Sequence, residues 1–166
     1  MIRPATPDDV PTIARLIRSL AEYERLSDRV VFDQAKLLEH LFGERRYAEV
    51  LLAEVNSVVA GFALFFHNYS TFQGKPGMYL EDLFVMPEFR GKGLGKSLLV
   101  ALAKVAVERG CGSVRWVVLK WNEPGIRFYE SLGASAMNEW TEYRLAGDPL
   151  KKVAAMDVET TKNAEK

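Results

Sequence analysis

The sequence predicts an α/β (α+β) fold, in which a mixed, mostly antiparallel central sheet of about six to seven strands is flanked by about four helices. Three observations support this class. Apolar residues near the N-terminus recur at helical spacing, three β-rich runs follow one another in the middle, and short apolar runs alternate with helical segments in the last third. Of the 166 residues, 48% are hydrophobic and 27% are charged, which is typical of a globular protein.

The first part of the chain predicts one short strand and two helices. Residues 2–4 form the strand, and Thr6 then caps a helix with Pro7 in its first turn. A second helix is expected over residues 33–43. The first helix carries a stripe of apolar side chains at helical spacing: Val10, Ile13, Ala14, Ile17, Leu20 and Ala21.

The middle of the chain predicts an antiparallel meander. Residues 50–55 and 58–66 are β-rich runs, and the pair Asn56-Ser57 between them is typical of a tight hairpin turn. The polar residues 68–77 are expected to form a loop, and residues 78–86 a third strand.

The last third predicts helices and strands in alternation. A glycine-rich loop leads into a helix over residues 96–109, and residues 114–119 form a short buried strand. Asn122 and Pro124 open a further helix, and residues 140–145 form the last strand.

Composition limits the function classes that fit this chain. We expect a single domain over residues 1–148 and a polar, frayed tail over residues 149–166. Basic and acidic residues number 22 each, and this balance argues against a nucleic-acid partner. The one cysteine, Cys111, cannot form an internal disulfide, which indicates a cytoplasmic protein. The longest apolar run, residues 58–66, is too short to cross a membrane.

The stretch RGKGLGKS, residues 90–97, has the composition of a phosphate-binding loop, and three patterns can be compared with it. A nucleotide-binding P-loop would need glycine where Arg90 stands. A dinucleotide-binding loop would need its third glycine at Lys96 or Leu98. The pattern R-x-x-G-x-G fits, with Arg90, Gly93 and Gly95.

The fitting pattern is a signature of the GCN5-related N-acetyltransferases (GNAT), and the sequence resembles that family. In the family the loop holds the pyrophosphate of acetyl-coenzyme A, by backbone N–H groups at a helix N-terminus. A second match supports the resemblance, because Asn122, Gly125 and Tyr129 fit the helix pattern N-x-x-A/G-x-x-x-Y about 30 residues later. A nucleotide-binding ATPase is disfavoured by the misfitted P-loop.

Within this family the sequence resembles the spermidine/spermine N1-acetyltransferase group, which also includes thialysine and diamine acetyltransferases. The similarity extends from Ile2 to about Leu145. It is carried by six segments: Ile2–Thr6, Ala21–Glu24, Tyr79–Asp82, Phe84–Met86, Arg90-Gly91 and Trp121–Pro124.

This resemblance implies the GNAT fold, acetyl-coenzyme A as co-substrate, no metal, and a homodimer. It implies that Tyr129 is the general acid that protonates the coenzyme A sulfur, whereas an isolated tyrosine would more often be a packed aromatic. The implied coenzyme A-binding residues are Leu83, Phe84, Val85, Arg90, Gly91, Lys92, Gly93, Leu94, Gly95, Lys96, Asn122, Gly125 and Tyr129.

The acceptor implied by the resemblance is a primary amine of a small cation, such as a polyamine, a diamine or a thialysine-like amino acid, which attacks directly in a ternary complex. Glu81 is the implied base, directly or through water, and Glu81 and Asp82 are implied substrate contacts. A plain salt bridge is the alternative role for Glu81. Tyr23 and Glu24 resemble the amine-contacting pair of the family, although solvation of a helix end also explains them.

Two arginines depart from the polyamine enzymes. Arg25 and Arg29 would repel a long polycation, and they would instead suit the carboxylate of an amino-acid substrate. A protein or peptide N-acetyltransferase and a non-catalytic coenzyme A-binding module remain the alternative functions.

Overall fold

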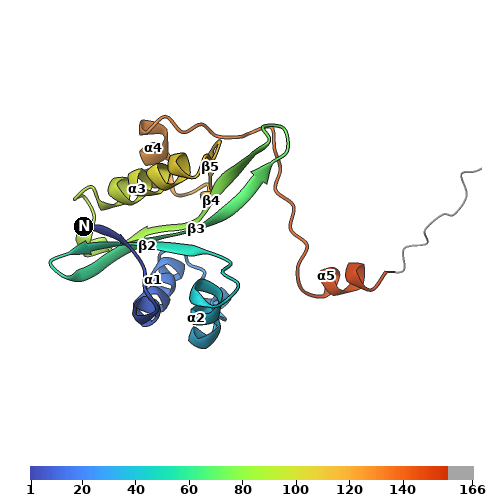
Figure 1. Ribbon diagram of the computed structural model, residues 1–166, viewed down its shortest axis with the longest axis horizontal. Helices are drawn as coiled ribbons and strands as arrows, with labels where there is room; N and C mark the ends of the chain where they lie inside the picture. Colours follow the sequence, from blue (N-terminus) through green and yellow to red (C-terminus); the bar gives the residue numbers. More distant parts are fainter. Residues whose placement is uncertain (157–166) are drawn as a thin grey trace, which may run out of the picture. The chain divides into compact units, whose positions relative to one another are not determined.

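The computed structural model describes residues 1–156, which fall into two compact units, Met1–Val117 and a second one that starts at Val118 (Figure 1). The first unit contains five strands and three α-helices, in this order: β1 (Ile2–Pro4), α1 (Val10–Tyr23), α2 (Gln34–Phe42), β2 (Glu49–Val55), β3 (Val58–Ser70), β4 (Lys75–Val85), α3 (Leu94–Glu108) and β5 (Val114–Arg115).

The strands form one sheet in the order β1-β2-β3-β4-β5. Every neighbouring pair is antiparallel except β4 and β5, which are parallel. This confirms the predicted α/β class with a mixed, mostly antiparallel sheet. Among the described residues there are five strands, slightly fewer than expected, and five α-helices.

Two helical layers cover the sheet of the first unit, with α1 and α2 on one side and α3 on the other (Figure 1). Alternate residues of a strand face opposite layers. On β2, Leu52 belongs to the core cluster that contains Ile13 and Leu16 of α1. All three side chains are fully buried, and each contributes about 1.5–3 kcal/mol of hydrophobic stabilisation.

The predicted start of the first helix is confirmed. Thr6 and Asp9 form a capping box around a single 3-10 turn, and α1 follows directly. Arg3 of β1 donates to both carboxylate oxygens of Asp9, at 2.7 and 2.8 Å. Because Arg3 also donates to Glu54 of β2, it joins the first strand to both the helix start and the sheet.

The tight hairpin predicted at Asn56-Ser57 is present, with φ of 50° and 65° at the two residues, as a type I′ turn requires. The loop predicted over residues 68–77 is wrong. The β3–β4 ladder continues to the pair Ser70↔Lys75, so only residues 71–74 turn. Polar residues indicate that a segment is exposed to water, but they do not show whether its backbone is hydrogen-bonded to a neighbouring strand.

The second unit contains α4 (Glu123–Ser131) and α5 (Gly147–Ala154). The helix predicted at Asn122 is therefore confirmed. The strand predicted over residues 114–119 is present but covers only residues 114–115, as β5. The strand predicted over residues 140–145 is wrong, because those residues form no strand. An apolar run becomes a strand only when another strand satisfies its backbone groups. The expected frayed tail contains α5, and its residues 157–166 lie outside the described part of the chain.

Candidate functional site

The predicted phosphate-binding loop lies between the end of β4 and the start of α3 (Figure 1). Gly91 and Gly93 have φ of 75° and 77°, a conformation that costs an L-residue about 1–2 kcal/mol. Gly93 is the N-cap of α3, and the backbone N–H and hydroxyl of Ser97 both bond to its carbonyl. Glycine is therefore required here by the backbone conformation.

The loop has the electrostatics of an anion site. The first turn of an α-helix leaves backbone N–H groups without intrahelical acceptors, and the helix dipole adds positive potential there. No acidic residue occupies the first turn of α3, whereas the exposed lysines Lys92 and Lys96 lie in this stretch. The arrangement suits a phosphate group that approaches the backbone.

The C-terminal half of β4 is paired on one side only within the first unit. Leu83, Phe84 and Val85 pair with β3, whereas β5 pairs with β4 only at Met78 and Tyr79. Among the described residues no strand continues beside these three on the β5 side. Such an edge can bind an extended ligand by main-chain hydrogen bonds, as an added strand does.

A β-bulge lies in β4 at the predicted base. Leu64 pairs with Asp82 and the next residue, Phe65, pairs with Leu80, so Glu81 is the extra residue of the bulge. Glu81 is exposed and Asp82 is half-buried. Bulges re-aim side chains and are common next to active sites. The extra residue therefore interrupts the regular alternation of side chains along β4 at these two neighbours.

Three carboxylates form an acidic cluster where β4 and the end of α1 meet: Glu24, Glu81 and Asp82. Burial, and after it the negative charges of Glu81 and Glu24, together raise the pKa of Asp82 to about 7. Burial also raises the pKa of Glu24. Carboxylates this close together attract a cation, because it offsets their mutual repulsion. A carboxylate with a raised pKa can also accept a proton near neutral pH.

Arg90 brings the loop and this end of α1 together. Its Nε donates to the carbonyl of Val85 at 2.9 Å. Its guanidinium lies 4.5 Å from the ring centre of Tyr23 and 5.5 Å from that of Phe84. Sequence reasoning missed this contact, because Tyr23 and Arg90 are far apart in the chain and no local pattern links them.

The remaining predicted site residues belong to the second unit. The side chain of Asn122 caps α4 by accepting from the backbone N–H of Gly125 at 3.2 Å. A side chain at Gly125 would meet that carboxamide at 2.9 Å, which explains the small residue in the pattern. Tyr129 lies on α4, where its ring contacts that of Phe128 at 5.2 Å.

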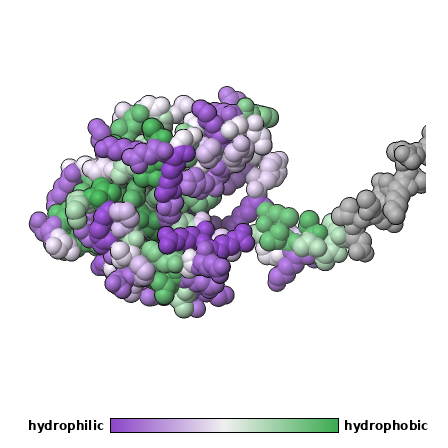
Figure 2. Space-filling model, in the orientation of Figure 1, coloured by the Kyte–Doolittle hydropathy of each residue, from purple (hydrophilic) through white to green (hydrophobic). Residues whose placement is uncertain are grey.

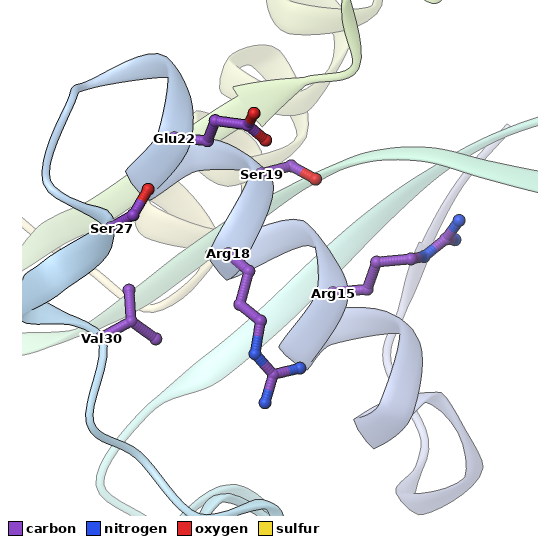
Figure 3. Close-up of a pocket in the computed structure, with 6 residues that line it drawn as sticks. All are labelled: Arg15, Arg18, Ser19, Glu22, Ser27 and Val30. Atoms are coloured by element: carbon purple, nitrogen blue, oxygen red, sulfur yellow. The ribbon is translucent and has the colours of Figure 1, made fainter.

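A cavity of about 390 Å³ lies on the outer surface of α1 and the segment that follows it (Figure 3). It is lined by Arg15, Arg18, Ser19, Glu22, Ser27 and Val30. The side chains of its two arginines extend outward from α1 in this view. None of the predicted site residues lines this cavity, and it lacks the loop and the acidic cluster.

No helix in residues 1–156 is both long and apolar enough to cross a membrane. Within the same residues, no three His, Cys, Asp or Glu side chains are grouped to hold a metal ion.

The chain is similar in sequence to acetyltransferases and in structure to several solved proteins. Residues 14–134 match the acetyltransferase (GNAT) family. A thialysine N-epsilon-acetyltransferase of Bos taurus is 39% identical, over 93% of this chain and 96% of the relative. An L-ornithine N5-acetyltransferase of Arabidopsis thaliana is 36% identical, over 95% and 89%. An integron cassette protein from the mobile metagenome of V. cholerae has a TM-score of 0.80 and 28% identity, over 94% and 98%.

Proposed function

This chain belongs to the GNAT acetyltransferase family, and we propose that it moves the acetyl group of acetyl-coenzyme A to a primary amine of a small cationic substrate. It is an N-acetyltransferase, and its relatives act on small amines. The observation that carries the finer proposal is the acidic cluster of Glu24, Glu81 and Asp82. Two of its members, Glu81 and Asp82, lie on β4, the strand that leads into the phosphate-binding loop.

Coenzyme A would be held along β4 and at the start of α3. The backbone N–H groups of residues 91–96 would bind the pyrophosphate, supported by the helix dipole and by Lys92 and Lys96. The pantetheine arm would lie beside Leu83, Phe84 and Val85, where the edge of β4 is open within the described residues. One N–H group of this edge would polarise the thioester carbonyl.

The reaction would proceed by direct attack in a ternary complex. The amine loses a proton to Glu81, directly or through water, with Asp82 beside it as a second acceptor. The amine nitrogen then bonds to the carbonyl carbon and the carbon–sulfur bond breaks. The phenol of Tyr129, with Asn122 and Gly125 shaping the start of its helix, returns a proton to the sulfur.

We further propose that the acceptor is an amino acid with an amine in its side chain. The two curated relatives named above are a thialysine and an L-ornithine acetyltransferase. The acidic cluster, with Tyr23 beside it, would bind the amine, and Arg25 follows Glu24 directly at the end of α1. A carboxylate on the substrate would offset the repulsion between Arg25 and a cation.

A peptide or protein acceptor is the second candidate. A ribosomal-protein-alanine N-acetyltransferase from Brucella melitensis is similar in structure, with a TM-score of 0.71 and 26% identity over 89% of this chain. A non-catalytic coenzyme A-binding module is a third candidate. A cytoplasmic homodimer remains part of the proposal, because the resembling group forms homodimers.

The test is thiol release from acetyl-coenzyme A with thialysine, L-ornithine, lysine, putrescine, spermidine, spermine and a basic peptide. We expect turnover with an amino acid that carries a side-chain amine. Tyr129→Phe should lower kcat by about 100-fold or more, because general acid catalysis contributes 10²–10⁴-fold. Coenzyme A should still bind this variant.

Three outcomes would contradict the proposal. Turnover of the peptide alone would favour the second candidate. Binding of coenzyme A without turnover of any acceptor would favour the binding module. An unchanged kcat for Tyr129→Phe would remove Tyr129 from the mechanism.

A further inference from the structure

Arg90 is the first residue of the R-x-x-G-x-G pattern, but its side chain is already held by the protein. The Nε atom donates to the carbonyl of Val85, at the end of β4. The guanidinium lies over the rings of Tyr23 and Phe84, at 4.5 and 5.5 Å from their centres. The two rings are themselves 6.5 Å apart and tilted by 52°. These contacts set the position of the guanidinium.

The partners of Arg90 belong to both halves of the candidate site. Val85 and Phe84 are on the strand edge proposed to hold the pantetheine arm. Tyr23 is the last residue of α1, and the next residue is Glu24 of the acidic cluster. On the other side, Arg90 is followed directly by Gly91, the first glycine of the phosphate-binding loop. One side chain thus touches the elements that would hold the two substrates.

The fold does not need Arg90 for its core. Arg90 is exposed, whereas Phe84, on which it lies, is buried with 3% of its surface accessible. Phe84 already packs in the cluster that it forms with residues of α1, α2, β2 and β3. The two lysines of the loop could not replace Arg90 in this role. A guanidinium is planar, so it can lie on an aromatic ring while one of its nitrogens donates a hydrogen bond, whereas an ammonium group has no such plane.

We propose that Arg90 is a positioning residue that couples the phosphate-binding loop to Tyr23, so that coenzyme A and the amine strengthen each other's binding. This inference rests on the proposed function, because it assumes those two ligands. Phosphate at the loop would hold the backbone of Arg90 in place. The guanidinium would then hold Tyr23, and with it Glu24, in the orientation that receives the amine. By linkage, bound amine would tighten coenzyme A by the same factor.

The first measurement is the Kd of coenzyme A by calorimetry, with and without saturating thialysine or L-ornithine, whichever turns over. In the unchanged protein we expect the amine to tighten coenzyme A by about 5- to 10-fold. Arg90→Lys keeps the charge and loses the plane, and Tyr23→Leu keeps an apolar side chain and loses the ring. Each should abolish the coupling, and the double variant should lose no more than either single variant.

Lys92→Met is the matched control. Lys92 lies two residues further along the loop, and its ammonium group is 5.4 Å from the ring centre of Phe89. This variant should weaken coenzyme A with and without the amine by the same factor, and so leave the coupling unchanged. The proposal is overturned if Arg90→Lys behaves in this way, or if the unchanged protein shows no coupling.

A second measurement separates this inference from the proposed function. The NMR signal of the Tyr23 ring, assigned by its loss in Tyr23→Phe, is recorded before and after coenzyme A alone is added. We expect the signal to move in the unchanged protein and to stay in Arg90→Lys. If it moves while no amine turns over, the link stands and the proposed function falls. If amines turn over and the signal does not move, the link is overturned and the function stands.

Discussion

Among single residues, Asp82 shows how the fold changes the chemistry of a side chain. An aspartate ordinarily ionises near pH 4. Here burial acts first and the charges of Glu81 and Glu24 add to it, which places the pKa at about 7. Because the three carboxylates influence one another, the measured value belongs to the cluster as a whole. At neutral pH the cluster can therefore gain or lose a proton.

Asp82→Asn tests this role through the pH dependence of kcat/KM. The unchanged enzyme should gain activity as pH rises through about 7, because Asp82 can serve as the second acceptor only after it has lost its own proton. The variant should lose this limb and keep the separate rise near pH 10 from the substrate amine. Glu88→Gln, at an exposed position after β4, is the control and should keep both limbs. A variant that retains the limb near pH 7 would assign it to another group.

The stability of the same variant gives an independent check. The folded pKa of Asp82 lies above its unfolded value, so the folded state binds more protons between about pH 4 and 7. The stability contribution of this group is therefore present below pH 4 and is lost as pH rises through 7. Asp82→Asn should stabilise the protein at pH 8 by on the order of 1–2 kcal/mol, and by less at pH 5. Equal effects at the two pH values would contradict the shift.

At the scale of elements, the end of α1 contains a backbone conformation that its sequence does not predict. Arg25 has φ of 60°, in the left-handed region. Its N–H bonds to the carbonyl of Glu22, and the N–H of Leu26 bonds to that of Ala21. This pair of bonds is the Schellman motif, which usually has glycine at the position of Arg25. The helix therefore ends where the predicted amine-contacting residues lie, at a cost in stability.

Arg25→Gly should raise the stability by up to about 1 kcal/mol, since the cost of the left-handed region is removed and is partly offset by a freer unfolded chain. This corresponds to about 2–4 °C in Tm for a chain of this size. Arg25→Ala is the matched control, because it removes the same side chain and keeps the cost. A gain in Tm for alanine as large as that for glycine would show that charge, not backbone conformation, is responsible.

At the scale of the whole molecule, the chain has no net charge, but its positive and negative groups gather at different places in the candidate site. Two residues of its acidic cluster, Glu81 and Asp82, lie on β4, and the proposed anion site follows in the next loop. Figure 2 shows a surface of mixed hydrophilic and hydrophobic residues, including hydrophobic ones on α5. Large apolar side chains are exposed in the C-terminal region: Met137, Trp140, Tyr143, Leu145, Leu150, Val153 and Met156.

Exposed apolar groups of this kind favour association. We therefore expect light scattering after size-exclusion chromatography to give about 37 kDa, twice the 18.7 kDa of one chain. Trp140→Ser and Leu145→Ser together should shift the mass toward one chain. The matched control is Thr71→Ala with Gln73→Ala at the exposed tip of the β3–β4 hairpin, which should leave the mass unchanged. A mass of 18.7 kDa for the unchanged protein would contradict the homodimer.

The sequence by itself determined the elements whose signals are local. The cap at Thr6, the turn at Asn56-Ser57 and the glycine-rich loop before α3 each depend on a few neighbouring residues. The R-x-x-G-x-G spacing pointed to the acetyltransferase family for the same reason. Such signals can be read without the fold, because the conformational preference or hydrogen bond involved spans only about one turn of chain.

Only the tertiary structure decided what depends on distant partners. The bulge at Glu81 exists because β3 pairs with β4 in two registers. The raised pKa of Asp82 depends on burial and on Glu24 from another element. The stack of Arg90 on Tyr23 joins residues that no pattern connects. Pairing, desolvation and side-chain contact are properties of three-dimensional neighbours, and the chain order does not contain them.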